Sequence, residues 1–211
     1  MGDHDRPERP SEQGTDRVCA SCGQRVRRPG PCDNPWCQRA DRAWSVIFAA
    51  GVYAGTLRRA IVDYKYRGRR CRLGGLVGLL ADYLQRYGPW LEEFDLMVPM
   101  PSYQGQEARR SWDPVSAVLA GAVDAAVPAW EVGWGAVTKR FETPALSGRS
   151  RFERVALAEG PLRRSLDVPD PDLVAGARIL VVDDVFTEGA TWREVARVLR
   201  RAGAVEVAGL V

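Results

Sequence analysis

The sequence predicts an α/β fold with a doubly wound, mainly parallel sheet, preceded by a small cysteine-rich module. The segment 178–184, "RILVVDD", is apolar up to its two final acids, which is typical of a central parallel strand covered on both faces. Segments with helical spacing of apolar residues alternate with short apolar runs of strand length. Two tight cysteine pairs stand in front of this alternating pattern.

Periodicity places the individual elements of the predicted domain. Prolines end the first strand, because proline cannot donate to a sheet, and Gly203 ends the last helix. Helices are expected within 73–87, 115–126 and 195–202, and strands within 94–101, 178–184 and 204–211.

Composition sets the limits of the chain. Its 211 residues, 45% of them hydrophobic, suffice for one α/β domain and a small module. The net charge of +3 neither indicates nor excludes nucleic acid as a partner. No run approaches the roughly 20 apolar residues of a membrane span, and a charged N-terminus is not a secretory signal, so we expect a cytoplasmic protein. The single histidine, His4, lies in a charged tail, which excludes a histidine-activated serine or cysteine nucleophile.

The chain divides into three parts by composition. Residues 1–17 hold few large apolar side chains and are expected to form a disordered tail. Residues 18–43, called the cysteine module below, precede a main domain over 44–211. Within that domain, about 128–172 is rich in arginine and proline and is expected to be loop structure.

Four cysteines indicate a metal site. Two residues separate Cys19 from Cys22, and four separate Cys32 from Cys37, across a loop rich in glycine and proline. Such pairs suit tetrahedral zinc, and four thiolate ligands leave no open position, so the zinc would be structural. Zinc would supply the folding energy of the module, about 10–16 kcal/mol in comparable small modules. The alternative is two disulfides or free thiols, and a cytoplasmic location argues against disulfides. Cys71 stands alone and is expected to be an ordinary core or surface residue.

The end of the segment 178–184 indicates a ligand site. In parallel sheets, ligands bind at the carboxyl ends of the strands, where Asp183 and Asp184 are expected. Paired carboxylates can accept hydrogen bonds from the vicinal hydroxyls of a ribose or share Mg²⁺. The turn 187–191, "TEGAT", enters a helix, so its amides and threonine hydroxyls could hold a phosphate. Together these features predict a ribose 5-phosphate site. An acidic loop that only caps the helix, or a receiver-like acid pair, is the alternative.

These residues carry a resemblance to a known family. The segment "LVVDDVFTEGAT" resembles the phosphoribosyl pyrophosphate (PRPP) motif of type I phosphoribosyltransferases. With the cysteine module in front, the chain is similar to the ComF group, whose competence-associated members look like amidophosphoribosyltransferase relatives. Three further stretches resemble ComF segments in the same order, over about 19–211: "YAGTLRRAIVDYKYRGRR" (53–70), "VPMPSY" (98–103) and "RFETPALSGRSRFER" (140–154).

The resemblance implies a phosphoribosyltransferase-like domain over 44–211, with 128–172 forming its hood. It also implies a reaction in which PRPP binds with Mg²⁺, pyrophosphate leaves, and a nitrogen base or amine takes its place. Asp183, Asp184 and Arg110 would then be the catalytic residues, and Arg140 or Arg154 would close over the pyrophosphate. The resemblance places the 5′-phosphate on Thr187, Glu188, Gly189, Ala190 and Thr191.

The chain departs from the family pattern at several positions. Glu188 replaces the second threonine of Thr–Thr–Gly, and we predict that its carboxylate turns away from the phosphate while its amide binds. Ser111 and Asp113 replace a glycine and an asparagine, and Leu146 and Leu157 replace a glutamine and an asparagine. These departures leave three functions open: a transferase with an altered substrate, a catalytically impaired PRPP- or nucleotide-binding relative, and a DNA-handling protein. The last would bind single-stranded DNA or competence proteins through the cysteine module and basic segments.

Overall fold

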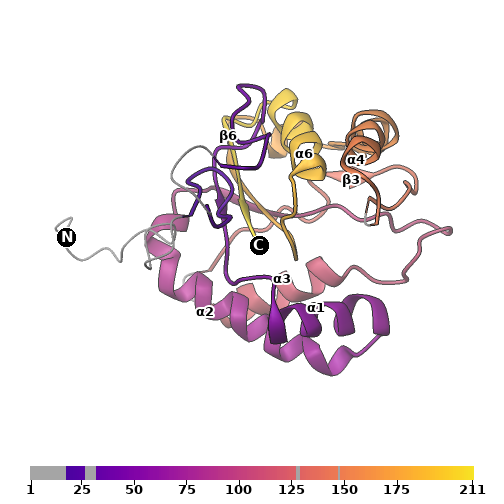
Figure 1. The fold of residues 1–211 in the computed structure, drawn as a ribbon. Coiled ribbons are helices and arrows are strands. Elements are labelled where there is room, and N and C mark those ends of the chain that lie inside the picture. The colour runs from indigo at the N-terminus through magenta and orange to yellow at the C-terminus, as the bar shows by residue number, and fades with distance from the viewer. Residues whose placement is uncertain (1–17, 27–31, 127–128, 147) are drawn as a thin grey trace.

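A four-stranded parallel sheet forms the centre of the molecule (Figure 1). The computed structural model describes residues 18–26, 32–126, 129–146 and 148–211, so the expected disordered tail over 1–17 lies outside the described residues. The strand order is β1-β6-β5-β2, which places β5 between two neighbours. The strands are β1 (Ile47–Phe48), β2 (Leu96–Pro99), β5 (Arg178–Val182) and β6 (Glu206–Leu210).

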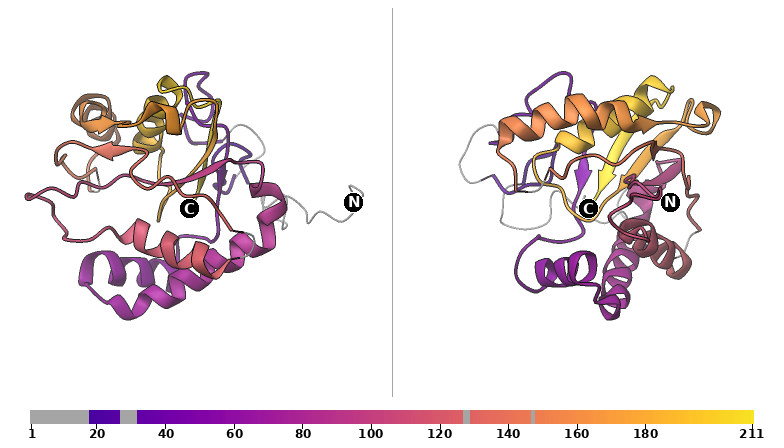
Figure 2. Two further views of the ribbon diagram at one scale, coloured as in Figure 1. Left: turned by 180° about the vertical axis from the view of Figure 1, so that it is seen from behind. Right: turned by 90° about the vertical axis from the view of Figure 1, so that its right-hand side faces the viewer.

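Helices cover both faces of this sheet (Figures 1 and 2). On β5, Ile179 and Val181 pack into the apolar cluster that includes α6, whereas Leu180 and Val182 pack into the cluster of α2 and α3. This alternation explains the unbroken apolar run in the sequence, because both faces of the strand are buried. One layer holds α1 (Gly55–Arg67), η2 (Arg70–Arg72), α2 (Leu73–Leu91) and α3 (Pro114–Ala125), and the other holds α6 (Ala190–Arg201) and α4 (Arg151–Leu157).

The structure confirms the predicted fold class and adds elements that periodicity did not reveal. The three predicted helices correspond to α2, α3 and α6, and the three predicted strands to β2, β5 and β6. Helix α1 was missed because its buried face is narrow, with only Ile61, Asp63 and Tyr64 buried. Strand β1 was missed because it has two residues.

The expectation of loop structure over 128–172 is wrong for 151–165. Ser150 and Glu153 form a capping box, which satisfies amides at the start of α4 and makes a helix favourable there. The remaining elements of this stretch are β3 (Thr138–Lys139), a π-helical turn (Ala158–Leu162), α5 (Arg163–Ser165), β4 (Leu166–Asp167) and η4 (Pro171–Leu173). Strands β3 and β4 pair antiparallel in a separate sheet.

The cysteine module packs directly on the main domain. Cys22 and Trp36 of the module are buried in the same apolar cluster as Trp44, β5 and α6 of the main domain. The amide of Ile47 also donates to the carbonyl of Ser21 at 3.1 Å. In the part of the chain that the structure describes, no helix has both the length and the apolar character needed to cross a membrane.

Candidate functional site

The two acids after β5 lie at the carboxyl edge of the sheet, as expected from a strand that ends at Val182. The Asp183 amide donates to the carbonyl of Leu210 at 3.0 Å, which continues the pairing with β6. Its Oδ1 accepts the amide of Asp184 at 2.8 Å. The carboxylate of Asp184 receives Nζ of Lys65 from α1 at 2.6 Å, and both of these side chains are about one-fifth exposed, at 21% and 19%.

Burial sets the protonation of this acid cluster. It raises the pKa of Asp183 well above the ordinary value, the charge of Asp184 raises it further, and Lys65 opposes the shift. Burial lowers the pKa of Lys65, but the charges of Asp184 and Asp183 outweigh it and the net pKa is raised. The charged form of Lys65 is therefore favoured, while Asp183 takes up a proton more readily than an exposed aspartate does. A divalent cation at this edge would favour the ionised form of Asp183 instead.

The turn 187–191 leads into α6 through Gly189, which has a φ of 95° and serves as the N-cap. A Cβ at this position would lie 2.7 Å from Cη2 of Trp44 and 2.9 Å from Cζ of Phe186. Glycine is thus required both by the backbone and by the neighbouring rings. Among the described residues no side chain caps α6, so the first amides of the helix, including those of Ala190 and Thr191, are available to an anion there.

The Glu188 side chain is held by α4 rather than by its own turn. Its Oε1 accepts Nη2 of Arg154, from α4, at 2.6 Å. Glu188 Oε2 and Arg154 Nε are buried and have no hydrogen-bond partner among the described residues. The carboxylate is therefore paired with Arg154, and its turning away from a bound phosphate stays a prediction.

The structure brings only one of the other two predicted arginines to this edge. Arg110 donates from Nε to the carbonyl of Lys65 at 3.0 Å, and its guanidinium lies 5.0 Å from the ring centroid of Tyr66. Arg110 is therefore beside the ion pair of Lys65. Arg140, which follows β3, instead donates to the carbonyl of Arg164 in α5 at 2.7 Å.

The departures from the family pattern have structural roles of their own. Asp113 caps α3 by accepting the amides of Val115 and Ser116, at 3.0 and 3.2 Å. Leu146 packs against the buried cluster that includes α6. Leu157 is the last residue of α4 and precedes the π-helical turn.

The cysteine cluster has the geometry of a metal site. The Sγ atoms of Cys19, Cys22, Cys32 and Cys37 all lie within 4.8 Å of one another. Tetrahedral zinc with Zn–S distances of about 2.3 Å holds its sulfurs about 3.8 Å apart, and Cys22 and Cys32 are 3.7 Å apart. All four thiols are free of disulfides, so the two-disulfide alternative is not what the structure shows.

Backbone amides and burial act on these sulfurs in opposite directions. Ser21 and Asn34 each donate an amide to a cysteine sulfur at 3.4 Å, one in each pair. Burial raises the pKa of Cys37 to about 12, and raises that of Cys22 further. Because a metal binds thiolates, four neighbouring sulfurs that are partly or fully buried are better accommodated with a cation among them than as isolated anions. The residues present therefore fit zinc.

A cavity of about 1010 Å³ opens beside the acids. It lies between the strand ends and the helices of the α1–α3 layer, and its wall includes Asp183 and Asp184. Most of the remaining wall is apolar or aromatic, with Phe48, Tyr53 and Tyr64 among the lining residues. The cavity offers space for a ligand with a flat or apolar part next to the carboxylates.

Sequence reasoning assigned no role to three residues that contact the site. Lys65 lies in the segment that resembles the Lys–Tyr–x–Gly stretch of ComF proteins, which was a usable signal. Gln24 and Asn34 donate side-chain amides to the carbonyls of Thr187 and Glu188. No local pattern could identify these two, because their partners are backbone carbonyls far along the chain.

Comparisons with known proteins give partial similarities. No family model matches the chain. Over 51 residues the chain is 45% identical to an amidophosphoribosyltransferase of Synechocystis sp. (strain ATCC 27184 / PCC 6803 / Kazusa), which covers 24% of this chain and 10% of that protein.

Among solved structures, a glutamine PRPP amidotransferase from B. subtilis, complexed with ADP and GMP, has 21% identity and a TM-score of 0.39. It is matched over 64% of this chain and 25% of its own. An allosteric regulatory enzyme of purine biosynthesis has 25% identity and a TM-score of 0.35, over 62% and 24% of the two chains. A purine phosphoribosyltransferase from Pyrococcus horikoshii Ot3 has 17% identity and a TM-score of 0.34, over 66% and 71%. The chain thus spans about a quarter of the length of the first two of these structures. Its membership of the ComF group stays a prediction.

Proposed function

We propose that this chain binds PRPP with Mg²⁺ at the carboxyl edge of its sheet and transfers the ribose 5-phosphate group to a nitrogen base or amine. The observation that carries the proposal is the pairing of two acids at the end of β5 with the uncapped N-terminus of α6. Carboxylates suit ribose hydroxyls and free helix amides suit a phosphate, so one ligand with both groups fits this edge. The local similarity to an amidophosphoribosyltransferase supports the same ligand.

Each part of the ligand has a candidate partner. Asp183 and Asp184 would accept the ribose hydroxyls, and the turn 187–191 would bind the 5′-phosphate through its amides and threonine hydroxyls. Arg110 would pair with the pyrophosphate, because a guanidinium can bind phosphate oxygens at two points. Mg²⁺, when bound, would offset the charge of the leaving pyrophosphate. The acceptor would occupy the cavity beside the acids.

We further propose that Zn²⁺ occupies the cluster of Cys19, Cys22, Cys32 and Cys37 in a structural role. The mutual distances of the sulfurs support this assignment. Purified protein with one zinc per chain and no freely titratable thiols among these four would agree with it. Protein that folds without metal and reacts at all four thiols would contradict it.

Calorimetry with PRPP, with and without Mg²⁺, tests the proposed function. Binding is expected only with Mg²⁺, and Asp183→Asn with Asp184→Asn should weaken it by about 100-fold or more, because two charge-assisted contacts are lost. Asp82→Asn with Asp124→Asn is the matched control, since it removes two exposed acids from the helical layer. Absence of binding at millimolar PRPP would refute the function. Binding that survives the Asp183/Asp184 change would refute the site.

A catalytically impaired PRPP- or nucleotide-binding protein is the second candidate. It is favoured by the two ion pairs Lys65–Asp184 and Arg154–Glu188, which already engage groups that the ligand would need. A pyrophosphate-release assay with nucleobases and amines separates it from the transferase. If the Glu188 carboxylate opposes the phosphate, Glu188→Thr should bind PRPP about tenfold more tightly than the wild-type chain does. Unchanged affinity would show that Arg154 fully neutralises it.

The DNA-handling alternative receives no support from the comparisons. It requires affinity for single-stranded DNA that falls steeply with salt. A fluorescence anisotropy titration at two salt concentrations is sufficient to decide it.

A further inference from the structure

The cysteine module contacts the turn 187–191 through two side-chain amides. Gln24 donates from Nε2 to the carbonyl of Thr187 at 2.7 Å. Asn34 donates from Nδ2 to the carbonyl of Glu188 at 3.0 Å. These carbonyls belong to the two residues that precede Gly189, where the backbone takes a left-handed conformation. The two bonds therefore fix consecutive peptide groups of the turn while leaving its amides unused.

Each of the two donors lies two residues after a cysteine of the cluster. Gln24 follows Cys22 by two residues, and Asn34 follows Cys32 by two residues. Asn34 is only 6% exposed, and its Oδ1 accepts the amide of Trp36 at 3.0 Å. The same side chain thus closes a turn of the metal cluster with its oxygen and supports the turn 187–191 with its nitrogen.

Packing reinforces these hydrogen bonds. Trp44 is 2% exposed and contacts Phe186 edge to face, with ring centroids 5.8 Å apart. It covers the face of Gly189, where a Cβ would clash with it. Its Nε1 donates to the carbonyl of Ser21, between the first two cysteines, at 3.0 Å. Movement of that cysteine pair would therefore disturb the packing behind Gly189.

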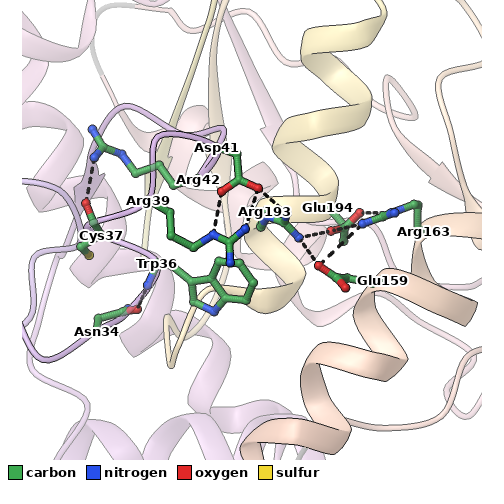
Figure 3. A network of polar contacts seen from close by, with 10 residues as sticks. All are labelled: Asn34, Trp36, Cys37, Arg39, Asp41, Arg42, Glu159, Arg163, Arg193 and Glu194. Atoms are coloured by element: carbon green, nitrogen blue, oxygen red, sulfur yellow. Dashed lines mark hydrogen bonds and ion pairs between the residues drawn. The ribbon is translucent and has the colours of Figure 1, made fainter.

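Arg193, in the first turn of α6, ties the same helix to the cysteine module and the hood (Figure 3). Its guanidinium pairs with Asp41 at 2.7 Å and Glu159 at 2.6 Å, and lies 4.7 Å from the ring centroid of Trp36. The Arg193 side chain is only 4% exposed. Residues of the module thus contact both the turn 187–191, which precedes α6, and Arg193 in the first turn of the helix.

We infer that Gln24 and Asn34 are positioning residues for the turn 187–191, and that zinc at the four cysteines determines whether both can act together. The metal would hold Cys22 and Cys32 close, and with them the two side-chain amides that donate to consecutive carbonyls. The order of the turn depends on zinc whatever ligand it binds. A second consequence rests on the proposed function: zinc and PRPP must strengthen each other's binding by the same factor, because linkage is reciprocal.

Hydrogen exchange of the full chain tests the positioning role. Removing zinc with a chelator is expected to speed exchange of the amides in 187–191 by about tenfold or more. The reason is that the turn opens more often when the hydrogen bonds from the cysteine module are lost. The amides of β5 should change little. Equal exchange in zinc-loaded and zinc-free protein, with both folded, would overturn the inference.

Zinc-loaded variants decide the matter even if the metal-free chain unfolds. Asn34→Asp keeps an oxygen for the Trp36 amide but has no N–H for the Glu188 carbonyl, and Gln24→Glu likewise loses its donor. With zinc retained, the two changes together should raise exchange in 187–191 by about tenfold. Gln38→Glu is the control for each single change, because it adds one negative charge within the module and its amide donates to the carbonyl of Cys32 instead. Unchanged exchange in the double variant, or the same increase in the control, would overturn the inference.

The coupling to PRPP is measured separately. Zinc affinity, from competition with a chromophoric chelator, should rise by about tenfold when PRPP saturates the protein, equivalent to 1.4 kcal/mol. In the Asn34→Asp, Gln24→Glu variant this rise should vanish. Equal zinc affinity with and without bound PRPP in the wild-type chain would overturn the coupling. If the wild-type chain does not bind PRPP at all, the proposed function fails, while the exchange results stand independently.

Discussion

The N-termini of α3 and α6 lie at the same edge of the sheet but are built in opposite ways. They follow β2 and β5, which are neighbouring parallel strands, so both helices begin at the carboxyl edge. At α3, the Asp113 carboxylate accepts the first amides, and Pro114 occupies the first helical position. At α6, Gly189 supplies no side chain and the first amides stay free.

The difference shows how the chain leaves the first amides of one helix without a side-chain cap among the described residues. A helix whose own carboxylate accepts its amides has no need of a ligand, and that negative charge repels phosphate. An uncapped helix must be stabilised in another way. Here the stabilisation comes from behind the turn, through the carbonyl contacts of Gln24 and Asn34 and through buried Arg193.

Removal of Arg193, which anchors the start of α6, should lower the free energy of unfolding most strongly. Arg193→Met removes one of the two arginine partners of the buried Glu194, and it also takes one arginine partner from Asp41 and from Glu159. Loss of one member of a buried charge network costs about 3–5 kcal/mol of unfolding free energy. Urea denaturation measures it, with Arg201→Met at the exposed end of α6 as control. A loss no larger than that of the control would contradict the anchoring role.

A side chain at Gly189 should have the next largest effect. Gly189→Ala adds backbone strain at a positive φ and a clash with Trp44 and Phe186, together about 3 kcal/mol. Gly135→Ala is the matched control, because its φ is 77° but nothing lies within 4 Å of the added Cβ. The difference between the two unfolding free energies measures the packing behind the turn. Equal losses would mean that the rings move aside freely.

Removal of the Asp113 cap of α3 should lower the free energy of unfolding by less than the two changes above. Asp113→Ala removes the cap of that helix and is expected to lower the unfolding free energy by about 1 kcal/mol. Asp124→Ala, near the C-terminus of the same helix, should instead be neutral or slightly stabilising, because a negative charge there opposes the helix dipole. Thermal unfolding of both variants measures the two changes, and a shared sign would contradict this account of the cap.

The smallest expected effect is on the pH dependence of the free energy of unfolding. The folded state raises the pKa of Asp183, so above about pH 4 the folded chain retains a proton that the unfolded chain has released. Because the folded state then binds more protons, the contribution of Asp183 to stability falls as pH rises until its folded pKa is passed. Asp183→Asn should remove that fall. Urea midpoints of both proteins from about pH 4 to about pH 8 measure it, and parallel curves would count against the shift.

Local patterns were sufficient to predict much of this molecule. The apolar run of β5, the acids that follow it, and the glycine before α6 were all predicted from neighbouring residues, because strand and helix periods are local properties. The close approach of the four cysteines followed from their spacing in the same way. Helix α1 escaped prediction because most of its surface is exposed and charged, which weakens the apolar period.

Tertiary structure alone decided which distant groups meet at the site. Lys65 pairs with Asp184 across 119 positions, and Gln24 reaches the carbonyl of Thr187 across 163. No period or motif encodes such pairs, since they depend on how the layers pack and on where a helix or turn ends against its neighbour. The sequence by itself therefore determined the elements, the acids and the open helix end. Packing of the cysteine module and hood decided how the turn is held, because its supports are single contacts between segments far apart in the chain.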